Sequence, residues 1–134
     1  SKIDHVGIAV NSLEEAVPRW RAILGEPPAG REEVEGEKVR VAFFGEGDGR
    51  VELLEPTDPD SAVARHLERR GPGVHHVCLR VEDLEAAVER ALDGGADLIP
   101  PGVREGAGGH RVAFLHPRST GGVLLELSEA PSAG

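Results

Sequence analysis

The chain has 134 residues, 39% of them hydrophobic, and a formal net charge of -9. It is therefore large enough to bury a core but too acidic to favour nucleic acid or an anionic membrane surface as its main partner. Its single cysteine, Cys78, excludes a disulfide within the chain and favours a reducing, cytoplasmic environment, and no apolar run reaches transmembrane length.

The first predicted element is a strand at residues 3–10, IDHVGIAV, where large apolar residues alternate with others. A helix follows. It starts near Asn11 or Ser12, residue types that favour a helix N-terminus, and ends at Gly25, a type that favours the C-terminus. Three extended segments are predicted next, at residues 31–35, 38–44 and 50–55.

A second helix is predicted over residues 58–71, and the same order of elements then returns. A strand at residues 74–81 precedes a helix that starts near Glu82 or Asp83 and ends near Gly94. Three further extended segments are predicted, at residues 97–99, 110–115 and 123–128.

This return is a tandem duplication. Residues 3–17 align with residues 74–88 at a shift of 71 positions (76 − 5), which places His5 on His76. The same shift aligns two copies of RVAF, which start at residues 40 and 111. Each half therefore has the order β-α-β-β-β. We predict a single α+β domain of two modules, about 1–57 and 72–130, joined by the linker helix.

Two adjacent histidines, His75 and His76, occur in the second copy of the first strand. Adjacent residues of a regular strand point to opposite faces, so the two imidazoles are not expected to share one function. His76 aligns with His5, whereas His75 aligns with Asp4. We therefore predict a functional role for His76 and a structural or exposed position for His75.

The last strand of each half ends in a second match, VELLE with LELSE, in which Glu52 aligns with Glu126. Both glutamates have apolar neighbours, so each carboxylate is either exposed to solvent or directed into a cavity. In the second case a pseudo-twofold axis brings them together with His5 and His76. Two imidazoles and two carboxylates would suit a divalent transition metal with open positions for substrate oxygens.

The sequence resembles the vicinal oxygen chelate (glyoxalase-like) superfamily and, within it, the methylmalonyl-CoA epimerases. The resemblance covers nearly the whole chain. Four stretches carry it: IDHVGIAV at 3–10, VELLEPTDPDS at 51–61, RGPGVHHVCLRVEDLEAA at 70–87 and GAGGHRVAFLHPRSTGGVLLEL at 106–127.

The resemblance implies a curled mixed sheet around a metal site. It implies metal-dependent epimerisation of (2R)- and (2S)-methylmalonyl-CoA, in propionate metabolism, through a metal-stabilised enolate. The family's metal ligands carry over to His5, His76 and Glu126, with Glu52 at a position that some members fill with Gln. Cobalt(II) is the metal usually associated with the family, while Mn²⁺, Ni²⁺ or Zn²⁺ suit the same ligands. A homodimer is also implied, with an acyl-CoA as the small-molecule partner.

Inverting a carbon centre calls for two acid/base groups or one mobile group. Glu126 and Glu52 are the nearest carboxylates, although a tightly bound ligand is a poor base. In some family members a glutamate proposed as the base lies on the strand that here reads KVRVAFF, and the matching position is Arg40.

Five residues are candidates for substrate binding. Arg40 and its repeat counterpart Arg111 either hold substrate anions or are ordinary surface charges. Arg118, Ser119 and Thr120 lie in a loop that is three residues longer in the second half, and this loop either receives the thioester tail or a phosphate, or is only a hairpin turn.

Three other functions fit the same fold. A glyoxalase I-type lyase would act on a glutathione hemithioacetal with the same metal ligands. An extradiol dioxygenase would use iron with two histidines and one carboxylate, so the fourth candidate, Glu52, speaks against it. A metal-free binding protein for a hydrophobic drug would have no reason to keep four metal-type residues in register.

Overall fold

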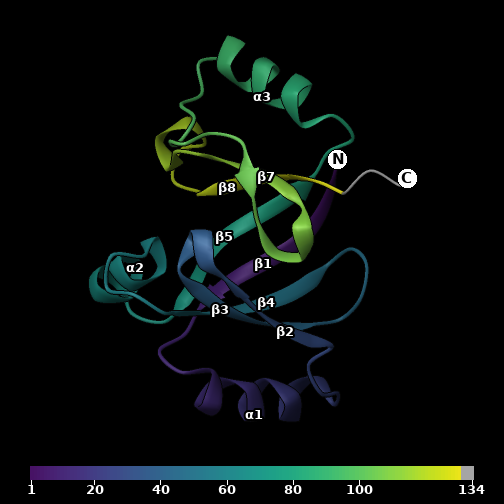
Figure 1. Cartoon of the computed structure of the whole chain (residues 1–134), viewed down its shortest axis with the longest axis vertical. Coiled ribbons are helices and arrows are strands. Elements are labelled where there is room, and N and C mark those ends of the chain that lie inside the picture. The colour runs from purple at the N-terminus through teal and green to yellow at the C-terminus, as the bar shows by residue number, and fades with distance from the viewer. Residues whose placement is uncertain (131–134) are drawn as a thin grey trace.

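Eight strands form one continuous mixed sheet in the computed structural model, which describes residues 1–130 (Figure 1). The strands are β1 (Lys2–Ala9), β2 (Gly30–Val34), β3 (Val39–Phe44), β4 (Arg50–Pro56), β5 (Gly73–Arg80), β6 (Arg104–Glu105), β7 (Arg111–Leu115) and β8 (Leu125–Glu129). The α-helices are α1 (Leu13–Leu24), α2 (Ala62–Arg70) and α3 (Leu84–Asp93). Short 3-10 turns are η1 (Glu35–Glu37), η2 (Ala107–Gly109) and η3 (Pro117–Ser119).

The strand order β2-β3-β4-β1-β5-β8-β7-β6 places the two modules side by side. The first strands of the modules, β1 and β5, pair antiparallel at the centre. Each also pairs in parallel with the last strand of its own module, β4 or β8. The repeated histidines and glutamates therefore lie on the four central strands. The predicted α+β class and curled mixed sheet are confirmed.

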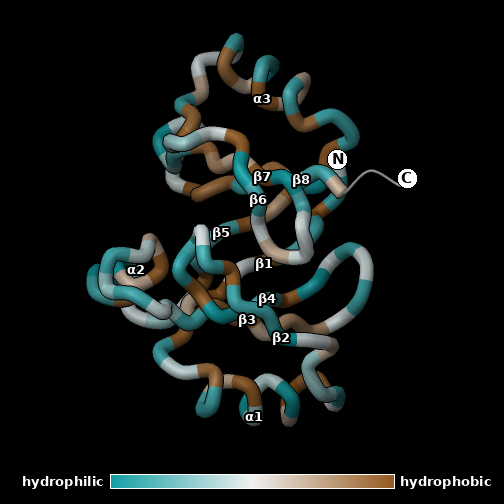
Figure 2. Tube along the Cα trace, in the orientation of Figure 1, coloured by the Kyte–Doolittle hydropathy of each residue, from teal (hydrophilic) through white to brown (hydrophobic). Residues whose placement is uncertain are grey.

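The helices α1 and α3 begin where the sequence predicts. The Ser12 hydroxyl accepts a hydrogen bond from the Glu15 amide, and the Asp83 carboxylate accepts one from the Ala86 amide. Each bond satisfies an amide group that would otherwise be free at a helix start. The apolar sides of both helices pack against the outer face of the curled sheet (Figures 1 and 2). The inner face is thereby left for the site.

Two predicted elements differ from the structure. The linker helix starts at Ala62, with Ser61 as its N-cap, instead of at residue 58. The extended segment predicted at 97–99 is wrong: only Leu98 forms an isolated bridge, and the strand of that module is β6, several residues later. Pro100 and Pro101 follow the predicted segment, and a proline has no amide hydrogen to donate to a neighbouring strand.

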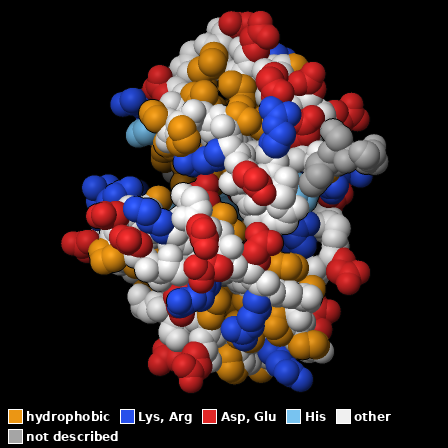
Figure 3. All heavy atoms as spheres, viewed as in Figure 1, with side chains coloured by type: hydrophobic (Ala, Val, Ile, Leu, Met, Phe, Trp, Pro, Cys, Tyr) orange, Lys and Arg blue, Asp and Glu red, His pale blue; other side chains and the backbone are white. Residues whose placement is uncertain are grey.

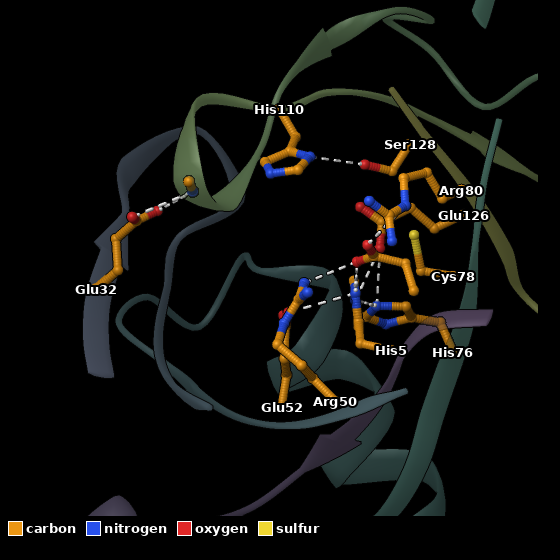
Figure 4. Close-up of polar contacts among 12 residues, drawn as sticks. His5, Glu32, Arg50, Glu52, His76, Cys78, Arg80, His110, Glu126 and Ser128 are labelled. Carbon is orange, nitrogen blue, oxygen red and sulfur yellow. Dashed lines mark hydrogen bonds and ion pairs between the residues drawn. The ribbon is translucent and has the colours of Figure 1, made fainter. Parts of the chain in front are cut away.

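The curl brings the two far edges of the sheet together. The Gly108 amide, in η2, donates to both carboxylate oxygens of Glu32, on β2, at 2.8 and 3.1 Å (Figure 4). Nearby, Arg104 Nε lies 3.0 Å from Glu37 Oε1. These contacts join the first module to the second at a place where no backbone ladder does so. Within residues 1–130, every helix is too short or too polar to cross a membrane.

Candidate active site

The inner face of the sheet encloses a cavity of about 650 Å³ that is open to solvent, and the surface is indented between the two modules in Figure 3. Strand side chains that point away from α1 and α3 line this cavity, because alternate residues of a strand face opposite sides. Much of the wall is apolar, as at Val39, Leu54 and Phe114. The four predicted metal ligands all line it: His5, Glu52, His76 and Glu126.

Three of those four side chains converge (Figure 4). The Nε2 atoms of His5 and His76 are 3.0 Å apart, and Glu126 Oε1 lies 3.2 Å from His5 Nε2 and 3.0 Å from His76 Nε2. Ligand atoms about 2.1 Å from one metal ion and at right angles to one another lie about 3.0 Å apart. The three buried groups therefore fit adjacent positions around a divalent transition metal, with further positions free for substrate oxygens.

Two β-bulges bring the residue before each histidine into the site as well. The ladder between β1 and β5 skips Asp4 in one strand and His75 in the other. Asp4 Oδ2 lies 2.7 Å from His5 Nδ1, and His75 Nδ1 lies 2.9 Å from His76 Nδ1. The prediction that His75 faces away from His76 is therefore wrong, because the alternation of a regular strand is interrupted at a bulge.

These contacts determine which ring nitrogen is free. Burial, together with the nearby His76 and His66, lowers the pKa of His75 to about 3. His75 is therefore neutral, and its Nδ1 can accept a hydrogen bond donated by Nδ1–H of His76. With Nδ1 of His5 likewise bonded to Asp4, both rings turn Nε2 to the centre, as metal-binding histidines require.

The centre is arranged to hold positive charge. Burial alone lowers the pKa of His5, but hydrogen bonds that include those to Asp4 and Glu126 outweigh this effect and raise the pKa to about 12. Burial alone raises the pKa of Glu126, but hydrogen bonds from His5 and His76 hold it well below its usual value. A cation at the point where the three ligand atoms converge suits this environment.

Gly7 makes room for the His76 ring. The two residues pair across the β1–β5 ladder, and a Cβ atom at position 7 would lie 2.2 Å from His76 Cε1. Any side chain there must displace the ring. The repeat counterpart of Gly7 is Cys78, which is fully buried and pairs with His5 in the same ladder. Each histidine is thus packed over the equivalent position of the other module.

Glu52 takes a different position from Glu126. Its Oε2 lies 3.3 Å from His5 Nδ1, not from Nε2, and 3.2 Å from Arg50 Nη2. The same Arg50 nitrogen donates to Asp4 Oδ2 at 2.8 Å. Glu52 would have to turn away from Arg50 to reach a metal held by the other three groups, so its role as a ligand stays a prediction.

The predicted substrate-binding residues lie outside the residues that line the cavity. Arg40 pairs with Glu55, and Arg111 pairs with Glu85 of α3. Both arginines thus lie on the helix side of the sheet. Arg118 pairs with Asp97, next to Ser119 and Thr120 in the η3 loop. A role for any of these residues in substrate binding stays a prediction.

Sequence reasoning missed three acidic or arginine residues of the cavity: Asp4, Arg50 and Glu37. The polar residue before each histidine was a visible signal for Asp4, since its counterpart is the imidazole of His75. Arg50 and Glu37 have no polar counterpart in the repeat, because the residues at the equivalent positions are Leu124 and Gly108. Neither could be recognised from the duplication.

Comparison with known proteins places the chain in a family. Residues 4–114 match the Glyoxalase/Bleomycin resistance protein/Dioxygenase superfamily. The chain is 40% identical to an uncharacterised protein, YqjC, of Bacillus subtilis, over 96% of this chain and 92% of that protein. It is 36% identical to the mitochondrial methylmalonyl-CoA epimerase of Homo sapiens, over 96% of this chain and 74% of that one.

The fold agrees with solved structures of that kind. A Streptomyces coelicolor methylmalonyl-CoA epimerase variant in complex with 2-nitronate-propionyl-CoA superposes with a TM-score of 0.92 at 36% identity, covering 98% of this chain and 96% of that one. Identity at this level, along nearly the whole chain, extends the match beyond the fold to the sequence. The chain belongs to the glyoxalase/bleomycin resistance protein/dioxygenase superfamily and, within it, to the methylmalonyl-CoA epimerase family.

Proposed function

We propose that this protein epimerises methylmalonyl-CoA, interconverting the (2R) and (2S) forms by removing and returning the proton at C2. The observation that carries this proposal is the convergence of His5, His76 and Glu126 in a buried, partly apolar cavity. Two relatives also support the proposal, because the human and Streptomyces coelicolor proteins are methylmalonyl-CoA epimerases.

The chemistry explains why such a centre is needed. The proton at C2 lies between a thioester and a carboxylate, and removing it places negative charge beside an existing negative charge. A divalent cation held by His5, His76 and Glu126 would supply positive charge to offset the charge that develops on the thioester oxygen. The protein's own part is to orient both imidazoles through Asp4 and His75, and to surround the substrate with a partly apolar wall.

We propose Co²⁺ as the cation, from the family resemblance, although Mn²⁺, Ni²⁺ and Zn²⁺ suit the same nitrogen and oxygen donors. The ligands are His5, His76 and Glu126, with Glu52 as a fourth when it turns from Arg50. Since Glu126 bonds to both imidazoles, it is better placed to hold the cation than to move a proton. The acid/base role predicted for Glu126 and Glu52 therefore needs a separate test.

The remaining features concern the surroundings of the site. Coenzyme A is much longer than the cavity, so its phosphates would lie on the surface, where Arg118, Ser119 and Thr120 stay candidates. A homodimer is proposed from the family resemblance, and analytical ultracentrifugation would check it. A cytoplasmic location in propionate metabolism is proposed from the resemblance and from the single buried, free thiol of Cys78.

The glyoxalase alternative is not favoured, because the human relative and the superposed Streptomyces coelicolor structure are methylmalonyl-CoA epimerases. An assay with methylglyoxal and glutathione tests this alternative. Turnover there, without turnover of methylmalonyl-CoA, would replace the proposal.

The deciding experiment measures loss of the C2 deuteron from 2-deuterated methylmalonyl-CoA in water, with and without added Co²⁺. We expect metal-dependent washout in the wild type and a loss on the order of a thousand-fold in His76→Ala, because the metal supplies several kcal/mol of charge stabilisation. No washout from folded, metal-loaded wild type would overturn the proposal.

A further inference from the structure

One carboxylate in the cavity is not engaged with the two central histidines. Glu37 ends η1, the turn between β2 and β3, and its side chain is 23% exposed. The other carboxylates of the cavity each lie against a histidine of the centre: Asp4 and Glu52 at His5 Nδ1, and Glu126 at both Nε2 atoms. Glu37 is therefore the carboxylate of the cavity lining that does not lie against a histidine of the centre, and its charged partner is Arg104.

The second module holds Glu37 in place. Its Oε1 lies 3.0 Å from Arg104 Nε, but the two atoms are not aligned as a hydrogen bond, and both are buried without another partner. The Arg104 guanidinium lies 4.9 Å from the centre of the Phe114 ring, and that ring meets the His76 ring edge-on at 5.6 Å. Glu37 is thus linked through two packed side chains to the centre without bonding to it.

The surroundings also set its protonation. Burial raises the pKa of Glu37, and the negative charge of Glu126 raises it further. The positive charges of Arg104 and His76 act in the opposite direction, but the net effect is a raised pKa. The pKa of Glu126, in contrast, is held low. Two carboxyl groups whose environments separate their pKa values take different parts in a reaction, and the one with the raised pKa is suited to carry a proton.

We infer that Glu37 is the acid/base residue that removes and returns the C2 proton on one face of the substrate. This inference rests on the proposed function. The C2–H bond breaks and its proton passes to a Glu37 carboxylate oxygen, while the bonding electron pair moves into the C1–C2 bond and the thioester C=O pair moves onto oxygen. A second acid, a water molecule or a protonated side chain, then delivers a proton to the opposite face. The C=O bond re-forms, the C1–C2 electron pair becomes the new C2–H bond, and Glu37 gives its proton to solvent. In the reverse direction Glu37 is the acid.

The test follows each enantiomer separately in D₂O, using cobalt-loaded wild type, Glu37→Gln and Glu37→Asp. In Glu37→Gln we expect exchange of the C2 proton to fall at least about a hundred-fold for one enantiomer, since a positioned acid/base group contributes about 10²–10⁴-fold. The other enantiomer still takes up deuterium but keeps its configuration, because the group that should protonate the Glu37 face is missing. Glu37→Asp is expected to restore part of the lost exchange.

Glu35→Gln is the matched control, because Glu35 is exposed at the other end of the same turn and should behave as wild type. Cobalt content and the unfolding midpoint are measured for every variant and should be unchanged in Glu37→Gln. The inference is overturned if Glu37→Gln exchanges both enantiomers like wild type, or if it loses both equally. Absence of exchange in the wild type would instead overturn the proposed function, so the two failures are distinguishable.

Discussion

The two modules supply equivalent residues but use them unequally. His5 and His76 lie at matching positions of β1 and β5, and both present Nε2 to the centre. Glu52 and Glu126 also match, yet Glu126 bonds to both Nε2 atoms while Glu52 lies at Nδ1 of His5. Duplication of a strand therefore duplicates the position of a side chain without duplicating its role.

The reason for the difference is one unmatched residue. Arg50 lies two residues before Glu52 and bonds to it, whereas the position two residues before Glu126 is Leu124. Arg50 also bonds to Asp4, so it joins both carboxylates of the first module on the Nδ1 side of His5. In the second module the equivalent position is Leu124, an uncharged residue, and Glu126 faces the imidazoles.

The largest expected effect comes from removing one charge from each glutamate in turn. Glu126→Gln should lose bound metal and reduce C2 exchange on the order of a thousand-fold, because it removes the carboxylate shared by both histidines. Glu52→Gln should keep its metal and most of its activity, in keeping with the Gln found there in some family members. Metal analysis and the washout assay check both variants, and equal losses would show that the modules do not differ as described.

The partners of the two Nδ1 atoms give the next effect. Asp4→Asn and His75→Leu should each weaken cobalt binding by about 10–100-fold, the usual cost of losing a group that orients a metal-binding histidine. The loss should be greater for Asp4→Asn, because Asp4 is a charged acceptor and His75 a neutral one. Competitive titration against a metal indicator measures both. Unchanged affinity in the two variants would contradict the tautomer assignment.

Gly7→Ala tests the packing of the His76 ring. We expect a loss of about 1–3 kcal/mol in the free energy of unfolding, typical of an overfilled site, with weaker metal binding because the ring must move. Gly36→Ala is the control, since a Cβ atom there meets no neighbour within 4 Å. Denaturant unfolding measures the difference. A wild-type midpoint for Gly7→Ala would mean that the ring has room to move without cost.

The last effect is a pH dependence of the stability of the protein stripped of metal. The pKa of His5 is about 12 in the folded state against 6.5 ordinarily, so its contribution to stability is complete below pH 6.5. It is lost as pH rises toward 12, at no more than about 1.4 kcal/mol per pH unit. The lowered pKa of Glu126 acts in the opposite sense, since its contribution is lost as pH falls below its ordinary 4.5.

Unfolding by urea at several values between pH 6 and pH 9 checks this dependence. The stripped wild type should lose stability steadily across that range, whereas His5→Gln, which cannot take up the proton, should show a flatter profile. Equal slopes in the two proteins would contradict the raised pKa of His5.

Much of the fold and part of the site could be predicted because the sequence is duplicated. The repeat aligned His5 with His76 and Glu52 with Glu126 before any geometry was known, and the structure brings these residues to one cavity. Local rules failed where the backbone is irregular. A bulge turns His75 into the site, and no property of the residues GVHHVC reveals a bulge.

Contacts between the two modules were the second kind of feature that could not be predicted from the sequence. Glu37 meets Arg104 only because the far edges of the sheet curl toward each other, and the two residues are not related by the repeat. Arg50 could have been noticed as a charge without a counterpart, but its effect on Glu52 depends on rotamers that a sequence pattern does not encode. Differences between repeats therefore deserve as much weight as their agreement when a site is predicted.

The central pairing of β1 with β5 has a consequence for the order of events in folding. β1 bonds to β4 within its own module, but its other edge bonds to β5, from Lys2 opposite Arg80 to Ala9 opposite Gly73. A growing chain must therefore emerge past residue 80 before that edge is covered. Until then, the first module presents an open strand edge, the kind of surface on which chains associate wrongly. The non-local pairing also predicts slow folding, because a long loop must close first.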